Sequence, residues 1–394
     1  MIIETLLAQM SSLSTAQRKF MKVLLTTWMC LRGKATFRNL SRYSQLNEKT
    51  YARWFRRPFD FVEFNRLCLA DLLAQRTRLI AVMDCSFSEK SGRHTYGLDK
   101  FYNSTHDRAQ KGLEISTLAF VDVEYATAYS FSTRQTPPPE HPDETRVDGY
   151  LQHLREDRHA LPDTIDYLVT DGYYSKKKFT DGVVDIGLHQ IGKLRHDANL
   201  RYLYQGPQKP RGRRRQYDGK VQFDDLSRLK WVREMEGVYI YTTVVHSVGL
   251  KRTIRITYLL KPDGHRLQTA LLFSTDTELS AEQMYRYYKA RFQIEFLFRD
   301  AKQFTGLSDC QARSKEALHF HFNAAMTVLN LLKLEDRQQA SNSQGHVISI
   351  MSWKIRKFNA HLLQRFSEKL GLDFSLIKSH PAYETLQNYG ATAA

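Results

Sequence analysis

Between residues 79 and 194, apolar and polar segments predict strands and helices in an order that is compatible with few folds. Residues 79–83 form an apolar run of strand length, and residues 113–133 contain two further strand-like segments joined near Glu124. A predicted helix, strand, helix and strand follow at residues 144–158, 166–170, 175–181 and 189–194. Three adjacent strands, followed by alternating helices and strands, predict an α/β domain whose mixed sheet lies between flanking helices.

The charge of the chain narrows the range of partners. The 394 residues include 58 Lys and Arg against 42 Asp and Glu, which gives a formal net charge of +16. Such an excess attracts polyanions, of which nucleic acid is the commonest. A membrane surface is the competing partner, but the sequence has neither the basic amphipathic helix nor the lipidation signal that such binding usually requires.

Several classes of protein are excluded by motifs that the sequence lacks. No apolar run reaches the roughly 20 residues that span a bilayer, and the N-terminal segment has no signal-peptide pattern. There is no P-loop for ATP and no GxSxG elbow of a serine hydrolase. His319 and His321 have no third zinc ligand at a usual spacing. The four cysteines form no CxxC pair, so we expect free thiols in a reducing cytoplasm.

The N-terminal region is predicted to be helical. Ser14 can cap a helix that runs to Leu31, with Gly33 just past its end. Two short helices with a turn near Asn47 fit residues 36–57, and this helix-turn-helix pattern is typical of proteins that read the DNA major groove. The second helix would present the basic side chains of Lys49, Arg53, Arg56 and Arg57. A small helical bundle with a solvated basic face fits the same residues.

Residues 195–264 differ in composition from the segments on either side. A Pro- and Gly-rich basic stretch is followed by alternating apolar segments, which predicts a β-rich insertion with a basic loop. The loop carries a cluster of arginines, namely Arg211, Arg213, Arg214 and Arg215. These would bind phosphates, although a solvated run of charge is the simpler alternative. A strand, a long helix and two further helices are then predicted at residues 269–274, 282–305, 315–333 and 352–370.

Three acidic residues stand out by their positions. Asp84 and Asp171 each follow a predicted strand, and Glu295 lies on the long helix among apolar and aromatic residues. In a sheet whose first and fourth strands are neighbours, the two aspartates lie side by side and repel, and a divalent cation relieves that repulsion. Oxygen ligands favour Mg²⁺, with Mn²⁺ as a substitute. Taken singly, each aspartate could instead cap a loop, and Glu295 could pair with Arg291 or Arg299.

The helix around Glu295 carries groups that suit a phosphodiester. Tyr288, Glu295 and Lys302 are seven residues apart, so at about 3.6 residues per turn they share one face. Arg291 lies one turn before Glu295, close to that face. A metal ion held by the glutamate, with cations beside it, can bind the phosphates of DNA. The alternative is an amphipathic helix with incidental i,i+4 pairs.

The spacing Y-x2-R-x3-E-x6-K, with DGYY upstream, resembles the signature of the insertion-sequence-four family of bacterial DDE transposases. The resemblance covers roughly residues 80–306 and implies an RNase H-like fold. It implies that the three acids, Asp84, Asp171 and Glu295, bind two divalent metal ions. It also implies that the remaining signature residues, Tyr288, Arg291 and Lys302, contact DNA phosphates. An aromatic residue is expected after the second aspartate, and both Tyr173 and Tyr174 stand there.

The resemblance also implies a reaction. Members of this family excise a DNA element through a hairpin intermediate and paste it elsewhere by two-metal phosphoryl transfer, without ATP. In relatives a tryptophan of the insertion helps to flip a base. Trp231 is the corresponding candidate here, and a place in the core is its alternative. We expect a bacterial, cytoplasmic and nucleoid-associated enzyme that binds terminal inverted repeats and target DNA as a homodimer in the synaptic complex.

The chain is therefore expected to divide into five parts. These are a helical DNA-binding domain (1–76), the RNase H-like catalytic domain in two parts (77–194 and 269–335), the β-rich basic insertion between them (195–268) and a C-terminal helical region (336–394). Two alternatives stay open: a catalytically inactive or domesticated DNA-binding protein, and another RNase H-like nuclease such as a junction resolvase. The presence of all three acids and the helix signature argues against the first, and the basic insertion argues against the second.

Overall fold

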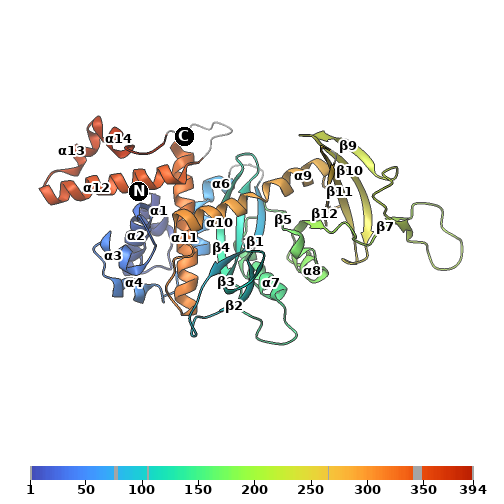
Figure 1. The fold of residues 1–394 in the computed structure, drawn as a ribbon, viewed down its shortest axis with the longest axis horizontal. Helices are drawn as coiled ribbons and strands as arrows, with labels where there is room; N and C mark the ends of the chain where they lie inside the picture. Colours follow the sequence, from blue (N-terminus) through green and yellow to red (C-terminus); the bar gives the residue numbers. More distant parts are fainter. Residues whose placement is uncertain (1, 75–78, 104–105, 265, 340–347, 393–394) are drawn as a thin grey trace.

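The computed structural model describes residues 2–74, 79–103, 106–264, 266–339 and 348–392. The predicted domain boundary between residues 76 and 77 lies outside this part of the chain. Figure 1 shows an elongated molecule, with the N- and C-terminal helices at one end, a β-rich region at the other and a sheet with flanking helices between them.

The strands of the described chain form one twelve-stranded sheet that is mostly antiparallel. Its order is β2 (Asp99–Asn103), β3 (Arg108–Asp122), β1 (Leu79–Glu89), β5 (Tyr167–Val169), β6 (His189–Leu194), β12 (Arg266–Ser274), β11 (Arg252–Asp263), β10 (Val238–Ser247), β7 (Leu200–Leu203) and β8 (Tyr217–Lys220). In addition, β4 (Thr127–Gln135) pairs with β3, and β9 (Lys230–Met235) pairs with β10. Only the β1–β5 and β5–β6 pairs are parallel among the described strands. The predicted mixed α/β class is therefore confirmed.

The helices come before, between and after the strands. The N-terminal ones are α1 (Ile2–Gln9), α2 (Thr15–Cys30), α3 (Phe37–Arg42), α4 (Glu48–Trp54), α5 (Phe61–Cys68) and α6 (Ala70–Ala74). Those within or after the sheet are α7 (Arg146–Asp157), α8 (Lys177–Asp185), α9 (Ala281–Ala290), α10 (Gln293–Phe304), α11 (Lys315–Gln339), α12 (Ile350–Leu370), α13 (Phe374–Ser379) and α14 (Ala382–Gln387). Short 3-10 turns cover Arg158–Ala160 and Gly172–Tyr174.

Helices cover both faces of the central strands. α10, α11 and α5 pack on β4, and α7 packs on β3. Successive side chains of a strand point to opposite faces. On β1 the carboxylate of Asp84 accordingly reaches Arg291, just before α10, whereas the thiol of Cys85 reaches Tyr174 on the other side. The sheet therefore separates one layer that contains α10 from another that contains α7.

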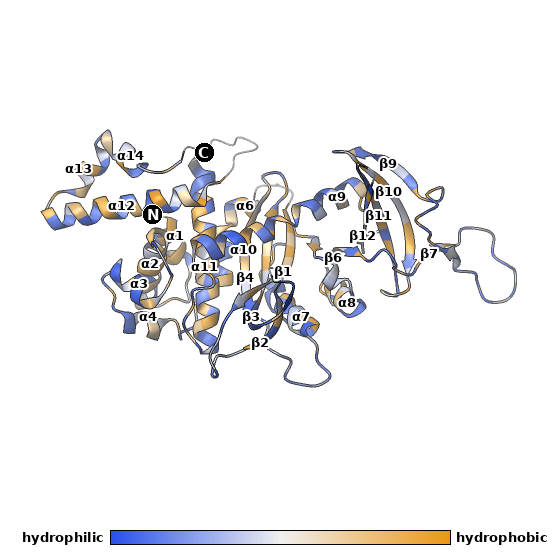
Figure 2. Ribbon diagram, viewed as in Figure 1, coloured by the Kyte–Doolittle hydropathy of each residue, from blue (hydrophilic) through white to orange (hydrophobic). Residues whose placement is uncertain are grey.

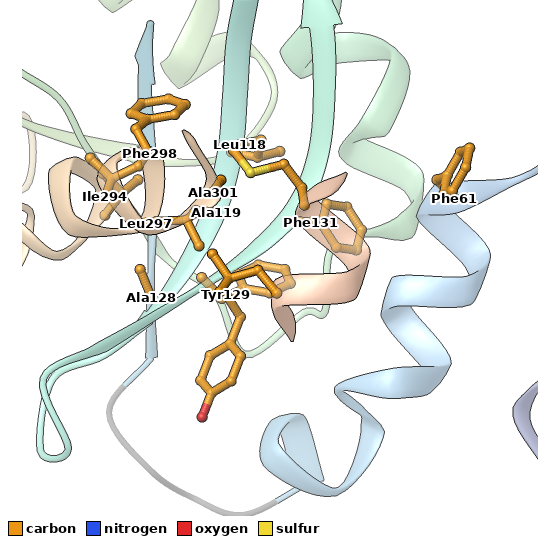
Figure 3. Packing of buried hydrophobic residues seen from close by; sticks show 14 of the residues in the cluster. Phe61, Leu118, Ala119, Ala128, Tyr129, Phe131, Ile294, Leu297, Phe298 and Ala301 are labelled. Carbon is orange, nitrogen blue, oxygen red and sulfur yellow. The ribbon is translucent and has the colours of Figure 1, made fainter. Parts of the chain in front are cut away.

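The apolar side of α10 anchors it to the sheet. Figure 3 shows Ile294, Leu297, Phe298 and Ala301 of α10 packed near the strand residues Leu118, Ala119, Ala128 and Tyr129. All of these side chains are buried. Figure 2 shows hydrophobic residues gathered in the central strands and hydrophilic residues along the loop that extends beyond β7. Because one side of α10 is fixed in the core, its opposite side is held at a defined place on the surface.

The predicted N-terminal helices are confirmed. Ser14 caps α2 in a capping box with Gln17, and Asn47 caps α4, as their positions in the sequence indicate. The prediction that the second short helix presents Arg56 and Arg57 is wrong, because α4 ends at Trp54. Both arginines are exposed in the turn beyond it, and the guanidinium of Arg57 lies 4.3 Å from the centre of the Trp54 ring.

Two predictions about the strands need correction. β1 does not end at Asp84 but continues to Glu89, because it pairs with β3 along its whole length. Only the first half of β1 is apolar, so the apolar run in the sequence predicted a strand that is too short. β2 was missed because its residues are largely polar, and it is held by backbone pairing to β3.

The predicted long helix is two helices, α9 and α10, that meet at Arg291 and Phe292. There the N–H groups of Ile294 and Glu295 donate to the carbonyls three residues earlier, at 3.0 Å each. Such i→i−3 bonds tighten the chain relative to an α-helix. The single continuous helix that was expected to carry Tyr288 and Glu295 is therefore interrupted between them.

The β-rich character of residues 195–264 is confirmed, but these strands continue the central sheet through the pairing of β12 with β6. Their own apolar core includes Val245, Ile256 and Phe273. The predicted boundary after residue 194 coincides with the end of β6, whereas those after residues 268 and 335 lie inside β12 and α11. The division into five parts stays a prediction.

Candidate active site

Asp84 and Asp171 lie at corresponding positions of two neighbouring parallel strands. Ala81 of β1 is opposite Leu168 of β5, and Val82 is opposite Val169. Each aspartate follows two residues further along its chain, where β5 has ended and no longer pairs with β1. The adjacency that was expected for the first and fourth strands is therefore present.

The environment of Asp84 disfavours its charge. Burial is the largest cause, the nearby carboxylate of Asp171 adds to it, and together they raise the pKa of Asp84 from 3.8 to about 7. The guanidinium of Arg291 and the N–H of Cys85, which donates to Asp84 Oδ1 at 2.8 Å, oppose this rise. The raised pKa thus follows first from burial, and the repulsion from Asp171 that adds to it is one that a bound cation relieves.

Arg291 joins Asp84 to Glu295. Its Nη1 lies 3.1 Å from Asp84 Oδ2, and its Nη2 lies 3.0 Å from Glu295 Oε1. The Arg291 side chain is 6% exposed, so these charge-assisted bonds are shielded from water on the arginine side. The tight turn between α9 and α10 places this guanidinium against the middle of β1.

Glu295 lies at the water-facing side of this cluster. Its side chain is 48% exposed, while Ile294, Leu297 and Phe298 point into the core. The expectation that Glu295 is enclosed by apolar residues is therefore wrong. The aromatic residues on either side of it, Phe292 and Phe296, are themselves exposed.

Tyr288 joins the cluster, and Lys302 does not. Burial raises the pKa of the Tyr288 phenol, Asp171 and Asp84 add to the rise, and Arg291 opposes it. The guanidinium of Arg291 lies 5.5 Å from the centre of the Tyr288 ring. Lys302 is exposed near the end of α10, and no hydrogen bond or ion pair in the described part of the chain links it to the acids.

The two tyrosines after Asp171 have different surroundings. Asp171 Oδ1 accepts the N–H of Tyr173 at 2.9 Å and so caps the short 3-10 turn. Tyr174 is buried, with its hydroxyl 3.1 Å from Cys85 Sγ. Tyr173 is 46% exposed, and the ammonium of Lys176 lies 3.8 Å from the centre of its ring. Tyr174 thus supports the turn from inside, whereas Tyr173 faces solvent beside the site.

Several residues behind the site could not be identified from the sequence. The hydroxyl groups of Tyr150 and Thr136 each donate to Glu114 Oε1 at 2.7 Å, on the face of the sheet where Cys85 meets Tyr174. The bonds to Glu114 hold β3, α7 and the segment after β4 together, and the contact of Tyr174 with Cys85 joins the turn after Asp171 to β1. Strand alternation could have placed Cys85 on that face, but only if β1 had been recognised to continue beyond Asp84.

The acids provide the chemistry of a metal site only in part. Within the described ranges, no three or more His, Cys, Asp or Glu side chains are grouped so as to hold one metal ion. Asp84 and Asp171 suit a hard divalent cation, because they are oxygen donors whose mutual repulsion such an ion relieves. Glu295 can join them only when the guanidinium of Arg291 turns away from the space between the carboxylates.

The other candidate DNA contacts lie away from the acids. Figure 1 shows α4, which carries the exposed Arg53, and the loop between β7 and β8 on opposite sides of α10. The arginines of that loop are exposed, namely Arg211, Arg213, Arg214 and Arg215. Trp231 is 57% exposed on β9, opposite Tyr241 of β10, so the alternative that it is a core residue is wrong.

Comparison with known proteins gives one family. Residues 90–331, more than half of the chain, match the family model described as "Transposase DDE domain". The matched range includes Asp171, Arg291 and Glu295 but begins six residues after Asp84. No curated protein matches the chain. No helix of the described residues is long and apolar enough to cross a membrane.

Proposed function

Since the chain belongs to the transposase DDE domain family, we propose that it cuts and joins DNA strands at Asp84, Asp171 and Glu295. The observation that carries this proposal is the convergence of these residues around Arg291. Asp84 on β1 and Asp171 just after β5 lie at corresponding positions of neighbouring parallel strands, and one guanidinium reaches both Asp84 and Glu295. The strand order β4–β3–β1–β5–β6, with the last three parallel, supports an RNase H-like assignment for the central sheet.

In this proposal the three carboxylates hold two Mg²⁺ ions, for which Mn²⁺ can substitute. The ions supply Lewis-acid stabilisation of the negative charge that develops at the reacting phosphate. The protein contributes orientation and counter-charge. Arg291 exchanges its carboxylate partners for phosphate oxygens of DNA, to which a guanidinium can donate two parallel hydrogen bonds. Tyr288 packs against that guanidinium and limits its movement.

The remaining parts of the chain bind DNA in this proposal. The α3–α4 pair and the turn after it read the terminal inverted repeats through Arg53, Arg56 and Arg57. The loop between β7 and β8 binds phosphates, Trp231 stacks on a flipped base and Lys302 contacts the backbone. The exposure of all these side chains supports such roles. By similarity to the insertion-sequence-four family, the protein acts as a homodimer that excises an element through a hairpin and inserts it into target DNA without ATP.

The test is strand cleavage and joining on duplexes that carry the DNA bordering the gene. With Mg²⁺ the parent is expected to nick the element end and to join it to a second duplex. Asp84→Asn, Asp171→Asn and Glu295→Gln should each abolish both products while DNA binding persists, because each removes a carboxylate and little volume. Asp163→Asn, at an exposed aspartate outside the cluster, is the matched control and should act like the parent.

Each outcome separates the proposal from its rivals. Binding without cleavage by the parent indicates a DNA-binding protein that has lost catalysis. Cleavage without joining indicates a simple nuclease. Parent-like joining by any one of the three acid variants refutes the assignment of the site.

A further inference from the structure

The backbone pairing between β1 and β5 stops before it reaches the two aspartates. Val82 and Val169 are the last partners of this parallel pair, and Asp84 and Asp171 lie two residues further along. At that level β1 still pairs with β3, and the N–H of Thr170 donates to β6 at 2.9 Å. The β1–β5 ladder therefore does not directly fix the separation of the two aspartates.

Electrostatic repulsion acts between these two residues. Asp171 lies close enough to Asp84 to destabilise its charged form. Like charges in close contact separate unless a cation lies between them or the surrounding protein resists the movement. The bridge made by Arg291 runs from Asp84 to Glu295, so it offsets the charge of Asp84 without joining it to Asp171. A contact that resists the separation is therefore needed elsewhere.

Such a contact lies on the opposite face of the sheet. Cys85 follows Asp84 directly, and because successive side chains of a strand alternate between faces, its thiol points away from the acids. There Sγ of Cys85 lies 3.1 Å from the hydroxyl of Tyr174, which is three residues after Asp171. This contact joins the two segments beyond the point where their backbones pair.

Tyr174 has little freedom to move. It is 2% exposed, and the centre of its ring lies 5.3 Å from that of Tyr150. Gln190 of β6 is fully buried, and its Nε2 donates to the carbonyl of Tyr174 at 3.3 Å and to the hydroxyl of Thr170 at 3.0 Å. The residues on both sides of Asp171 are thus tied to β6, while the hydroxyl of Tyr174 ties the same turn to β1.

We propose that Tyr174 and Cys85 are positioning residues, whose contact sets the separation of Asp84 and Asp171 and thereby the affinity of that pair for a divalent cation. The inference rests on the proposed function, in which these carboxylates hold Mg²⁺. This ion requires near-ideal octahedral geometry, so its affinity is sensitive to the spacing of its ligands. Loss of the contact should weaken metal binding without removing any ligand.

The test measures the affinity for Mn²⁺ by electron paramagnetic resonance, with the protein on an element-end duplex that has already been cut. Tyr174→Phe removes the hydroxyl and keeps the ring, and Cys85→Ala removes the thiol. Each should raise the dissociation constant for Mn²⁺ by roughly 10- to 100-fold, the range typical of residues that orient metal ligands. The affinity for DNA in EDTA should stay that of the parent, because the variants keep the DNA-binding side chains.

Two further variants and one control complete the design. Cys85→Ser keeps a polar group opposite the Tyr174 hydroxyl and should recover most of the Mn²⁺ affinity that Cys85→Ala loses. The double variant of Tyr174→Phe with Cys85→Ala should bind no more weakly than the weaker single variant, because both changes remove the same contact. Tyr51→Phe is the matched control and should bind Mn²⁺ like the parent. Tyr51 is also buried, and its hydroxyl lies 2.9 Å from Ser44 Oγ in the N-terminal region.

The proposal is overturned if Tyr174→Phe and Cys85→Ala bind Mn²⁺ as tightly as the parent, or if their losses add in the double variant. If Asp171→Asn loses Mn²⁺ while these variants keep it, the positioning role fails and the assignment of the acids stands. If the parent itself binds no Mn²⁺, the proposed function fails together with the inference, so the two failures are distinguishable.

Discussion

Arg291 is the residue through which the acidic side chains interact. Its terminal nitrogens contact Asp84 at 3.1 Å and Glu295 at 3.0 Å, and Asp84 in turn lies within the field of Asp171. One nearly buried guanidinium therefore forms ion pairs with an acid on β1 and an acid on α10, which are about two hundred residues apart in sequence. In the proposed function, a divalent ion and a phosphate compete for the two ends of this bridge, so the binding of metal and the binding of DNA are coupled.

The raised pKa of Asp84 predicts a pH-dependent stability. The folded state holds the proton up to about pH 7, whereas the unfolded state releases it near 3.8. As pH rises between these values the unfolded state loses protons first, so the parent loses stability relative to Asp84→Asn. In EDTA, the gap between their free energies of unfolding should widen from pH 4 to pH 7, to on the order of 4 kcal/mol, and then level off.

Urea denaturation at a series of pH values measures this gap. Asp163→Asn, at an exposed position, should differ from its parent by a constant amount. If the difference in free energy of unfolding between Asp84→Asn and its parent is also constant with pH, burial and Asp171 do not raise the pKa of Asp84.

At the scale of single elements, a buried amide joins the N-terminal helices to the sheet. Asn65 of α5 donates through Nδ2 to the carbonyl of Phe131 at 3.0 Å, and its Oδ1 accepts from Thr327 at 3.1 Å and from Asn330 at 3.3 Å. These contacts link α5, β4 and α11. The packing of α5 on the sheet and on α11 is thus supported by the hydrogen bonds of one buried side chain.

Replacing Asn65 should weaken the packing of α5 on β4 and α11 and lower the free energy of unfolding. Asn65→Ala removes the buried partner of Thr327 Oγ1 and the donor to the Phe131 carbonyl, while Asn330 keeps its bonds to Ser130, and we expect a loss of about 1–3 kcal/mol in the free energy of unfolding by urea. Asn199→Ala, at an exposed asparagine, should cost far less. Equal losses in the two variants would contradict the structural role of Asn65.

The elements around the site also show how far the sequence could be interpreted. The strands before Asp84 and Asp171 were predictable, because their apolar runs are short, and their parallel pairing brings the aspartates to one edge. The i,i+4 contact of Arg291 with Glu295 was an alternative that the sequence offered and is present. The contact of Arg291 with Asp84 was not predictable, because it joins residues that lie far apart in the sequence. The support from Tyr174 and Cys85 was missed because half of β1 is polar and is held by backbone pairing alone.

At the scale of the whole molecule, basic groups lie at both ends and the acids lie between them. Figure 1 shows the loop between β7 and β8 projecting from one end and α3–α4 near the other. In the proposed function these groups contact a bound DNA duplex on both sides of the site.

The loop between β7 and β8 should contribute mainly to the salt dependence of binding. Its four exposed arginines are Arg211, Arg213, Arg214 and Arg215. Their replacement by glutamine should reduce the slope of log affinity against log salt by up to about 0.9 for each phosphate that the loop no longer neutralises. The position of the cut should not change. The control variant, Lys369→Gln with Lys378→Gln at the C-terminal end, should have the same slope as the parent. An unchanged slope in the loop variant would show that the loop between β7 and β8 does not contact DNA phosphates.

The central claim is that Asp84, Asp171 and Glu295 together bind divalent cations when DNA is present. Mn²⁺ binding, followed by electron paramagnetic resonance with the parent on an element-end duplex, tests it directly. We predict saturable binding of two ions per site, a loss of binding in Asp84→Asn, Asp171→Asn and Glu295→Gln, and parent-like binding in Asp163→Asn. Unchanged Mn²⁺ binding in the three acid variants would contradict the account.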